Sequence, residues 1–104
     1  MDPSILHIME KLRSRIAGKY RIHDLRVFGS SASGERRTGS DIDVLVCLSE
    51  LNRTIEEELF DIAYDLELEY DCLIDLIAIS KEDIKGRIGA APIYEKILTE
   101  SVPA

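Results

Sequence analysis

The hydrophobic positions of this chain change period several times, and each change predicts an element. Near the start, five apolar residues recur at helical spacing up to Gly18, which predicts an amphipathic helix that opens at Asp2 and Pro3. Its apolar residues are Ile5, Ile8, Met9, Leu12 and Ile16. The segment "LRVFG" at 25–29 is typical of a short strand, and "DIDVLVCL" at 41–48 predicts a second strand because it is rich in β-favouring residues.

A second amphipathic helix is predicted in "TIEEELFDIAYDLELEY". Thr54 and Glu57 have the spacing of a capping box, which predicts where this helix begins. "CLIDLIAIS" at 72–80 predicts a third strand that is nearly all apolar except for Asp75. The apolar stripe of the helix consists of Ile55, Leu59, Ile62, Leu66 and Tyr70.

Two further helical segments are expected after the third strand. "SKEDIKGRIG" is typical of a connector that contains one turn of helix, and Pro92 opens a last helix. The apolar side of that helix would consist of Ile93, Ile97 and Leu98.

This order of elements predicts an α/β (α+β) fold with a small mixed three-stranded sheet flanked by helices. The connection through the acidic helix is long enough for a parallel crossover between the second and third strands, whereas a direct return of the first strand to the second would be antiparallel. With 104 residues, the chain is expected to form a single domain over residues 1–104.

Composition favours a folded protein that binds neither membranes nor nucleic acid in general. Hydrophobic residues make up 45% of the chain and charged residues 32%, and the net charge of −7 argues against affinity for DNA or RNA backbones. No apolar run approaches the roughly 20 residues that a membrane span needs, and the first residues lack the pattern of a secretory signal. We therefore expect a cytoplasmic location.

The charges are unevenly distributed along the chain. Residues 10–37 hold eight of the thirteen basic residues against three acids, whereas residues 50–75 hold ten acids against Arg53 alone. Two solvated helix faces would explain this pattern. An anion-binding flank and an acidic surface that faces a partner would explain it equally well, and both interpretations stay open.

The cysteines and histidines do not have the spacing of a metal site. Cys47 and Cys72 both lie in apolar runs, which favours buried thiols over a disulfide, and His7 and His23 stand apart from each other and from the cysteines. A structural zinc site is therefore disfavoured.

Three aspartates are the first candidates for chemistry. Side chains alternate along a strand, so Asp41 and Asp43 would share a face, with their α-carbons about 6.6 Å apart. Two such carboxylates can converge on a hard cation such as Mg²⁺, which prefers oxygen ligands and needs only one or two carboxylates in addition to water and phosphates. Asp75 would join them if the third strand lies beside the second, and three acids around a metal pair would suit attack at phosphorus.

The loop between the first two strands supplies small and basic residues. Gly29 and Ser30 follow the first strand, and a glycine there lets the backbone approach a phosphate closely. Arg36 and Arg37 could neutralise a triphosphate. A P-loop is excluded because Glu35 stands where its lysine belongs, and "DIDVLV" lacks the third acid and the glycine of an EF-hand loop.

Each of these features also fits a purely structural role, such as a strand cap for Asp41 or a turn at Gly29-Ser30. The ordered set favours a site, because the small-residue turn, the spaced acids and the acid within the third strand are independent of one another.

The same set carries a family resemblance. Gly29-Ser30-x-Ala32-x-Gly34, then Asp41-x-Asp43 and an apolar strand, resembles the signature of the polymerase-β-type nucleotidyltransferases. The short length and the sequence Ser40-Asp41-Ile42-Asp43 resemble the minimal nucleotidyltransferase (MNT) group, including the antitoxins of HEPN/MNT toxin–antitoxin systems. Family members often have arginine at the position of Ser33 and frequently also at Ser31.

This resemblance implies a nucleotidyltransferase fold and Mg²⁺-dependent transfer of AMP from ATP to a hydroxyl. Asp41 and Asp43 would bind two metal ions, and Asp75 would bind one of them and help to activate the hydroxyl. The residues that bind the nucleotide phosphates would be Gly29, Ser30, Arg36, Arg37 and Ser40. The acceptor would be a tyrosine of a HEPN-domain ribonuclease toxin encoded by a neighbouring gene, and an oligomer is possible.

Two other functions remain open. The same fold could neutralise its partner by binding alone, which the serine at position 33 favours. A nucleotidyltransferase of the drug-modifying kind would act on a small molecule, although the chain is short for the additional domain that grips such an acceptor.

Overall fold

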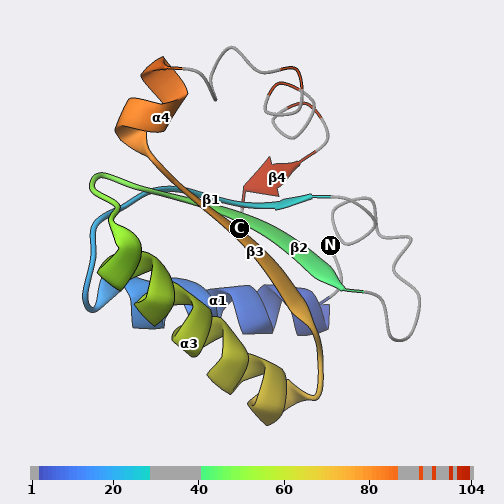
Figure 1. Cartoon of the computed structure of the whole chain (residues 1–104). Helices are drawn as coiled ribbons and strands as arrows, with labels where there is room; N and C mark the ends of the chain where they lie inside the picture. Colours follow the sequence, from blue (N-terminus) through green and yellow to red (C-terminus); the bar gives the residue numbers. More distant parts are fainter. Residues whose placement is uncertain are drawn as a thin grey trace.

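A computed structural model of the chain describes residues 3–28, 41–86, 92, 95, 99 and 101–103. The helices and strands of these residues follow one another in the order that the sequence predicts, with one additional short strand at the end (Figure 1). The elements are α1 (Pro3–Ala17), β1 (Ile22–Phe28), β2 (Ile42–Leu48), α3 (Arg53–Tyr70), β3 (Ile74–Ser80), α4 (Lys81–Lys85) and β4 (Val102–Pro103).

The strands form one mixed sheet in the order β3-β2-β1-β4. β1 and β2 are antiparallel, whereas β2 and β3 are parallel and joined through α3, so the predicted fold class is confirmed. The two-residue strand β4 pairs with β1 through Val27 and Val102, and it was not predicted because so short a segment carries no alternation to detect. β3 therefore forms one edge of the sheet.

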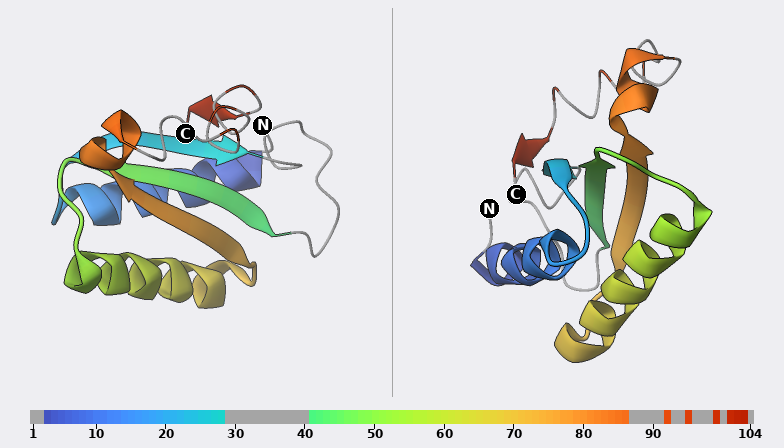
Figure 2. Two further views of the ribbon diagram at one scale, coloured as in Figure 1. Left: turned by 45° about the horizontal axis from the view of Figure 1, so that its top comes forward. Right: turned by 90° about the vertical axis from the view of Figure 1, so that its left-hand side faces the viewer.

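Helices α1 and α3 lie together on one face of the sheet (Figures 1 and 2). Alternate residues of β2 enter the core beneath them, since side chains in a strand point to opposite faces. The five apolar residues predicted for the first helix are all buried in the same core. The completely buried residues of β2 in this cluster are Ile42, Val44, Val46 and Leu48.

Helix α3 begins two residues before the position expected from Thr54 and Glu57, so the predicted capping box is wrong. The N-cap is Asn52, whose side-chain oxygen accepts a hydrogen bond of 2.9 Å from the backbone N–H of Ile55. Asparagine is among the strongest N-cap residues, and this bond satisfies a donor that the helix itself cannot satisfy. Thr54 consequently lies inside the first turn.

The predicted apolar stripe of α3 faces the core, although not evenly. Ile55, Leu59 and Leu66 are buried, as is Ala63, whereas Ile62 and Tyr70 are partly buried. The helix ends at Asp71, which adopts the left-handed conformation with φ of 49° and donates its N–H to the carbonyl of Glu67.

The other face of the sheet carries a smaller apolar cluster. Leu45, Cys47 and Ile79 are buried there, with Phe28 of β1 and Ile84 of α4 packed against them. The predicted turn of helix in the connector is α4, which a capping box between Ser80 and Asp83 starts. Cys47 is fully buried as expected, and Cys72 is half-buried.

At the end of the chain, Pro92, Glu95 and Thr99 have helical backbone, and the Thr99 hydroxyl donates to the Glu95 carbonyl at 2.9 Å. The expected apolar side of this helix, Ile93, Ile97 and Leu98, lies outside the described residues. Among the helices that are described, none is both long and apolar enough to span a membrane.

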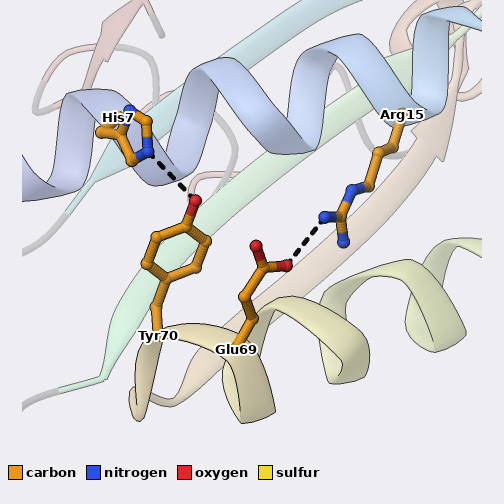
Figure 3. Close-up of polar contacts among 4 residues, drawn as sticks. All are labelled: His7, Arg15, Glu69 and Tyr70. Carbon is orange, nitrogen blue, oxygen red and sulfur yellow. Dashed lines mark hydrogen bonds and ion pairs between the residues drawn. The ribbon is translucent and has the colours of Figure 1, made fainter.

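Polar contacts join α1 to α3 at several points (Figure 3). The guanidinium of Arg15 donates to the carboxylate of Glu69 at 2.8 Å, and the hydroxyl of Tyr70 lies 3.0 Å from Nε2 of His7. Just after α1, the Tyr20 hydroxyl donates to Glu58, and this hydrogen bond raises the pKa of Tyr20. Part of the charge asymmetry along the sequence is therefore explained by contacts within the molecule, because the basic α1 packs beside the acidic α3.

Candidate functional site

Two of the three candidate acids are in register on neighbouring parallel strands. Asp43 of β2 pairs with Asp75 of β3, as the sequence predicts if the third strand lies beside the second. Their neighbours Ile42 and Ile74 are buried in the core under the helices, so both carboxylates lie on the opposite face of the sheet. Asp75 is exposed, because β3 is an edge strand.

The electrostatics of Asp43 show that all three acids interact. Asp43 is half-buried, and its pKa is raised above the usual value, first by burial, then by the negative charge of Asp75, and then by that of Asp41. Asp41 is exposed and immediately precedes β2 instead of starting it. Through the register of the parallel pair, the charge of Asp75 thus acts on Asp43 more strongly than that of Asp41, its neighbour in sequence.

The chemistry of these groups fits a divalent cation. Within the described ranges, no group of three or more His, Cys, Asp or Glu side chains is placed so that it could hold a metal ion by itself. Mg²⁺ needs only one or two carboxylates when phosphate oxygens supply further ligands, and it would neutralise the charges that raise the pKa of Asp43. Asp43, with its two acidic neighbours, therefore suits a metal that arrives with a phosphate-bearing substrate.

Strand β1 ends beside these acids. Its last residue, Phe28, pairs with Asp43, so β1 reaches the level of the carboxylates one residue before Gly29. The predicted phosphate-binding residues lie outside the part of the chain that the structure describes, and their role stays a prediction. They are Gly29, Ser30, Arg36, Arg37 and Ser40.

The structure adds side chains on the same face that sequence reasoning did not select. Ile77 lies two residues beyond Asp75 and is 39% exposed, and Leu73, two residues before it, is 56% exposed. On β1, Arg26 donates to the carboxylate of Asp24 at 2.7 Å and to the hydroxyl of Ser101 at 3.2 Å. Strand alternation could have placed Ile77 beside Asp75, but only the edge position of β3 leaves it exposed.

A polar cavity of about 490 Å³ lies elsewhere, at the other ends of β2 and β3. Its lining includes Glu50 and Glu82 and none of the three aspartates. The three acids therefore do not belong to this cavity.

Comparison with known proteins agrees with this arrangement. The family model of the nucleotidyltransferase domain matches residues 9–102. A curated protein of Methanocaldococcus jannaschii, named for a proposed protein adenylyltransferase activity, is 33% identical over 73 residues, which cover 70% of this chain and 73% of that protein.

Solved structures with the same fold include one described as a proposed minimal nucleotidyltransferase. It is 28% identical, with a TM-score of 0.65, and the match covers 100% of this chain and 97% of that one. A toxin–antitoxin crystal structure with AMP-PNP is 22% identical over 93% of this chain and 69% of that chain, with a TM-score of 0.62. A complex of a tri-AMPylated HEPN toxin with its MNT antitoxin from Shewanella oneidensis has a TM-score of 0.54 at 19% identity, over 93% of this chain and 66% of that chain.

The family match spans nearly the whole chain, including all three strands that the sequence predicts and the paired acids. The enzyme class that the sequence predicts, a nucleotidyltransferase, is confirmed at the level of the family. The chain belongs to the nucleotidyltransferase domain family.

Proposed function

We propose that this protein is a Mg²⁺-dependent adenylyltransferase that acts as an antitoxin. It would transfer AMP from ATP to a tyrosine hydroxyl of a HEPN-domain ribonuclease toxin encoded by a neighbouring gene. The observation that carries this proposal is the register of Asp43 and Asp75 on adjacent parallel strands, with Asp41 close enough to influence the pKa of Asp43.

In this proposal each acid has a distinct task. Asp41 and Asp43 hold Mg²⁺, which when bound stabilises the negative charge that develops on the phosphates during transfer. Asp75, which is exposed at the sheet edge, would bind one metal ion and accept the proton of the attacking hydroxyl. The hydroxyl oxygen forms a bond to the α-phosphorus as the bond to the pyrophosphate oxygen breaks, so pyrophosphate leaves.

The nucleotide phosphates are assigned to the loop that follows β1. Gly29 and Ser30 would bind them, since Phe28, the last residue of β1, pairs with Asp43 and directly precedes Gly29 in the sequence. Arg36, Arg37 and Ser40 would complete the contacts to the triphosphate.

The surface beside Asp75 suits an aromatic acceptor. Ile77 and Leu73 offer exposed apolar side chains on either side of this carboxylate along the chain. A tyrosine ring can pack on such side chains while its hydroxyl reaches the acid, whereas a sugar hydroxyl gains little from them. This favours a protein acceptor over a polar small molecule.

The relatives support the same partner and reaction. One similar protein is named for protein adenylyltransferase activity, and one similar structure contains a tri-AMPylated HEPN toxin with an MNT antitoxin. For location we propose the cytoplasm, because neither cysteine is in a disulfide.

A second candidate is a non-catalytic antitoxin that neutralises the same toxin by binding. Ser33 stands where family members often have arginine, and the loss of that cation would weaken the grip on a triphosphate.

One experiment separates the two candidates. The protein is incubated with the neighbour-encoded HEPN protein, Mg²⁺ and labelled ATP, in parallel with the Asp41→Asn and Asp43→Asn variants. We expect label on the partner that disappears in both variants and falls at a tyrosine by mass spectrometry. Tight, neutralising association without label, unchanged in the variants, would refute catalysis and support the binding antitoxin.

A further inference from the structure

The outer face of α3 carries an apolar stripe that the core does not use. Phe60, Tyr64 and Leu68 follow one another at intervals of four residues, so they lie on one face of the helix. Their exposed fractions are 44%, 58% and 67%. Single exposed apolar residues are common, but three large ones aligned on a helix already buried along another face indicate a contact surface.

This stripe points away from the core. Leu59 is the neighbour of Phe60 in the sequence, and Leu66 lies two positions from both Tyr64 and Leu68. Both leucines are completely buried. Each step of one residue rotates a helix by about 100°, so the stripe faces a different direction from these leucines. The stripe therefore does not belong to the packing of α3 against the sheet or α1. In Figures 1 and 2, α3 forms the outer layer of the molecule on the side away from α4.

Acids border the stripe on both sides. At 3.6 residues per turn, Asp61 and Asp65 fall along one border. Glu56 falls along the other, as does Glu67, whose carboxylate already accepts a hydrogen bond from the backbone N–H of Ile74. Asp61 and Asp65 are exposed, and neither has a hydrogen bond or ion pair to another residue that the structure describes. Other acids of α3 are already matched to cations, as Glu69 is to Arg15.

We infer that this face of α3 is a docking surface for an amphipathic helix of a partner protein, one whose apolar seam is bordered by lysines or arginines. The apolar stripe supplies the burial, and the acids along its borders select a basic partner and exclude an acidic one. The identification of that partner with the HEPN toxin rests on the proposed function. The apolar stripe and its acidic borders are observed independently of that function.

A synthetic helical peptide of about 18 residues tests the surface directly. Its leucines form one seam and lysines border it, and a scrambled peptide of the same composition serves as the probe control. Binding is measured by isothermal titration calorimetry at several salt concentrations for the wild type and for a Phe60→Ser/Leu68→Ser variant. We expect the double substitution to weaken binding by about tenfold or more, because it removes two of the three apolar anchors of the stripe.

Leu6→Ser is the matched control, because Leu6 is also 44% exposed but lies on α1. It should bind the peptide like the wild type, and Asp61→Asn/Asp65→Asn should lower both the affinity and its salt dependence. Circular dichroism verifies that each variant is folded. Equal affinity in the wild type and the Phe60→Ser/Leu68→Ser variant, no binding at all, or an equal loss in Leu6→Ser would overturn the inference.

The same variants with the neighbour-encoded HEPN protein separate this inference from the proposed function. If the wild type and the Phe60→Ser/Leu68→Ser variant (the α3 variant) bind that protein equally well, the assignment of the docking surface is wrong while the proposed function stands. If the wild type neither binds nor labels it, the proposed function is wrong and the peptide alone decides on the surface. A wild-type dimer in sedimentation that the α3 variant loses would assign the stripe to a second copy of the chain and overturn the inference.

Discussion

Asp43 and Asp75 lie opposite each other on two parallel strands, and each belongs to a different physical environment. Asp43 is half-buried in the middle of the sheet, whereas Asp75 is exposed on its edge. Burial is the largest cause of the raised pKa of Asp43, and the negative charge of Asp75 is the next. The pair is therefore held together by the fold against its own repulsion.

That repulsion predicts that Asp43→Asn stabilises the protein in the absence of metal at neutral pH. Because the folded-state pKa is raised, the charged form costs stability above that pKa, and the cost disappears as the pH falls below the unfolded value. A change of about 1 kcal/mol shifts the Tm of a domain of this size by about 4–8 °C. The gain in Tm should be smaller than this, because solvent reaches Asp43 and screens the repulsion. Thermal unfolding with EDTA at neutral and acid pH measures it; a lower Tm than that of the wild type at neutral pH would contradict it.

With Mg²⁺ and a non-hydrolysable ATP analogue, we expect the order to reverse. A ligand at about 100 times its Kd adds about 2.7 kcal/mol to the stability of the protein that binds it, and Asp43→Asn should lose most of this gain. Activity in the labelling assay should fall on the order of 100-fold or more. Arg53→Gln, a charge change at an exposed position at the start of α3, is the control and should keep both properties.

Ile77→Ser should impair transfer to a protein acceptor without impairing nucleotide binding. If the tyrosine ring packs on Ile77, the KM for the partner should rise about tenfold, the lower end of the effect of losing one apolar contact because Ile77 is partly exposed. The Kd for the ATP analogue should stay constant. Steady-state labelling and calorimetry provide the two numbers. An unchanged KM, or an equal rise in the Kd for nucleotide, would contradict this role.

Cys47 should be inert in the folded protein. Burial raises the pKa of its thiol to about 11, so at pH 8 only about one molecule in a thousand carries the reactive thiolate. We expect a thiol reagent to modify Cys72 alone in the native state and both cysteines in denaturant. Cys72→Ser should leave no reactive thiol until the protein unfolds.

The contacts between α1 and α3 should contribute unequally to stability. Arg15→Ala removes an exposed ion pair and should change the free energy of unfolding by less than about 1 kcal/mol. Leu59→Ala leaves a cavity at a completely buried position and should cost about 2–5 kcal/mol. Urea denaturation of the two variants tests this ranking, and a larger effect for Arg15→Ala would contradict it.

Much of this architecture could be predicted because its signals are local and periodic. The apolar residues of α1 and the alternation in β2 follow directly from helix and strand geometry, and the long connection through α3 favours a parallel crossover. The start of α3 was predicted wrongly from Thr54 because two candidate N-cap residues lie within three positions. Asn52, the stronger N-cap residue, is the one that caps the helix.

The site was predictable only in part. The prediction that Asp75 joins the other acids depended on the third strand lying beside the second. The observed register of Asp43 with Asp75 confirms that arrangement. The exposure of Ile77 could not be predicted, because a mid-strand isoleucine is normally buried and only the strand order places it on the rim. The exposed stripe on α3 was not predicted either. Its three apolar residues lie among the acids of the helix, and the buried face of α3 has its own regular spacing that does not include them.

The position of Asp75 on an edge strand has a consequence for solubility. The outer edge of β3 presents backbone N–H and C=O groups, and the residues around Asp75 are mostly apolar, which is the composition of a strand that pairs with other molecules. Proteins protect such edges by placing a charge on them. The carboxylate that the proposed chemistry needs would therefore also oppose the pairing of one copy's sheet edge with the next, and a neutral residue at this position would favour such pairing.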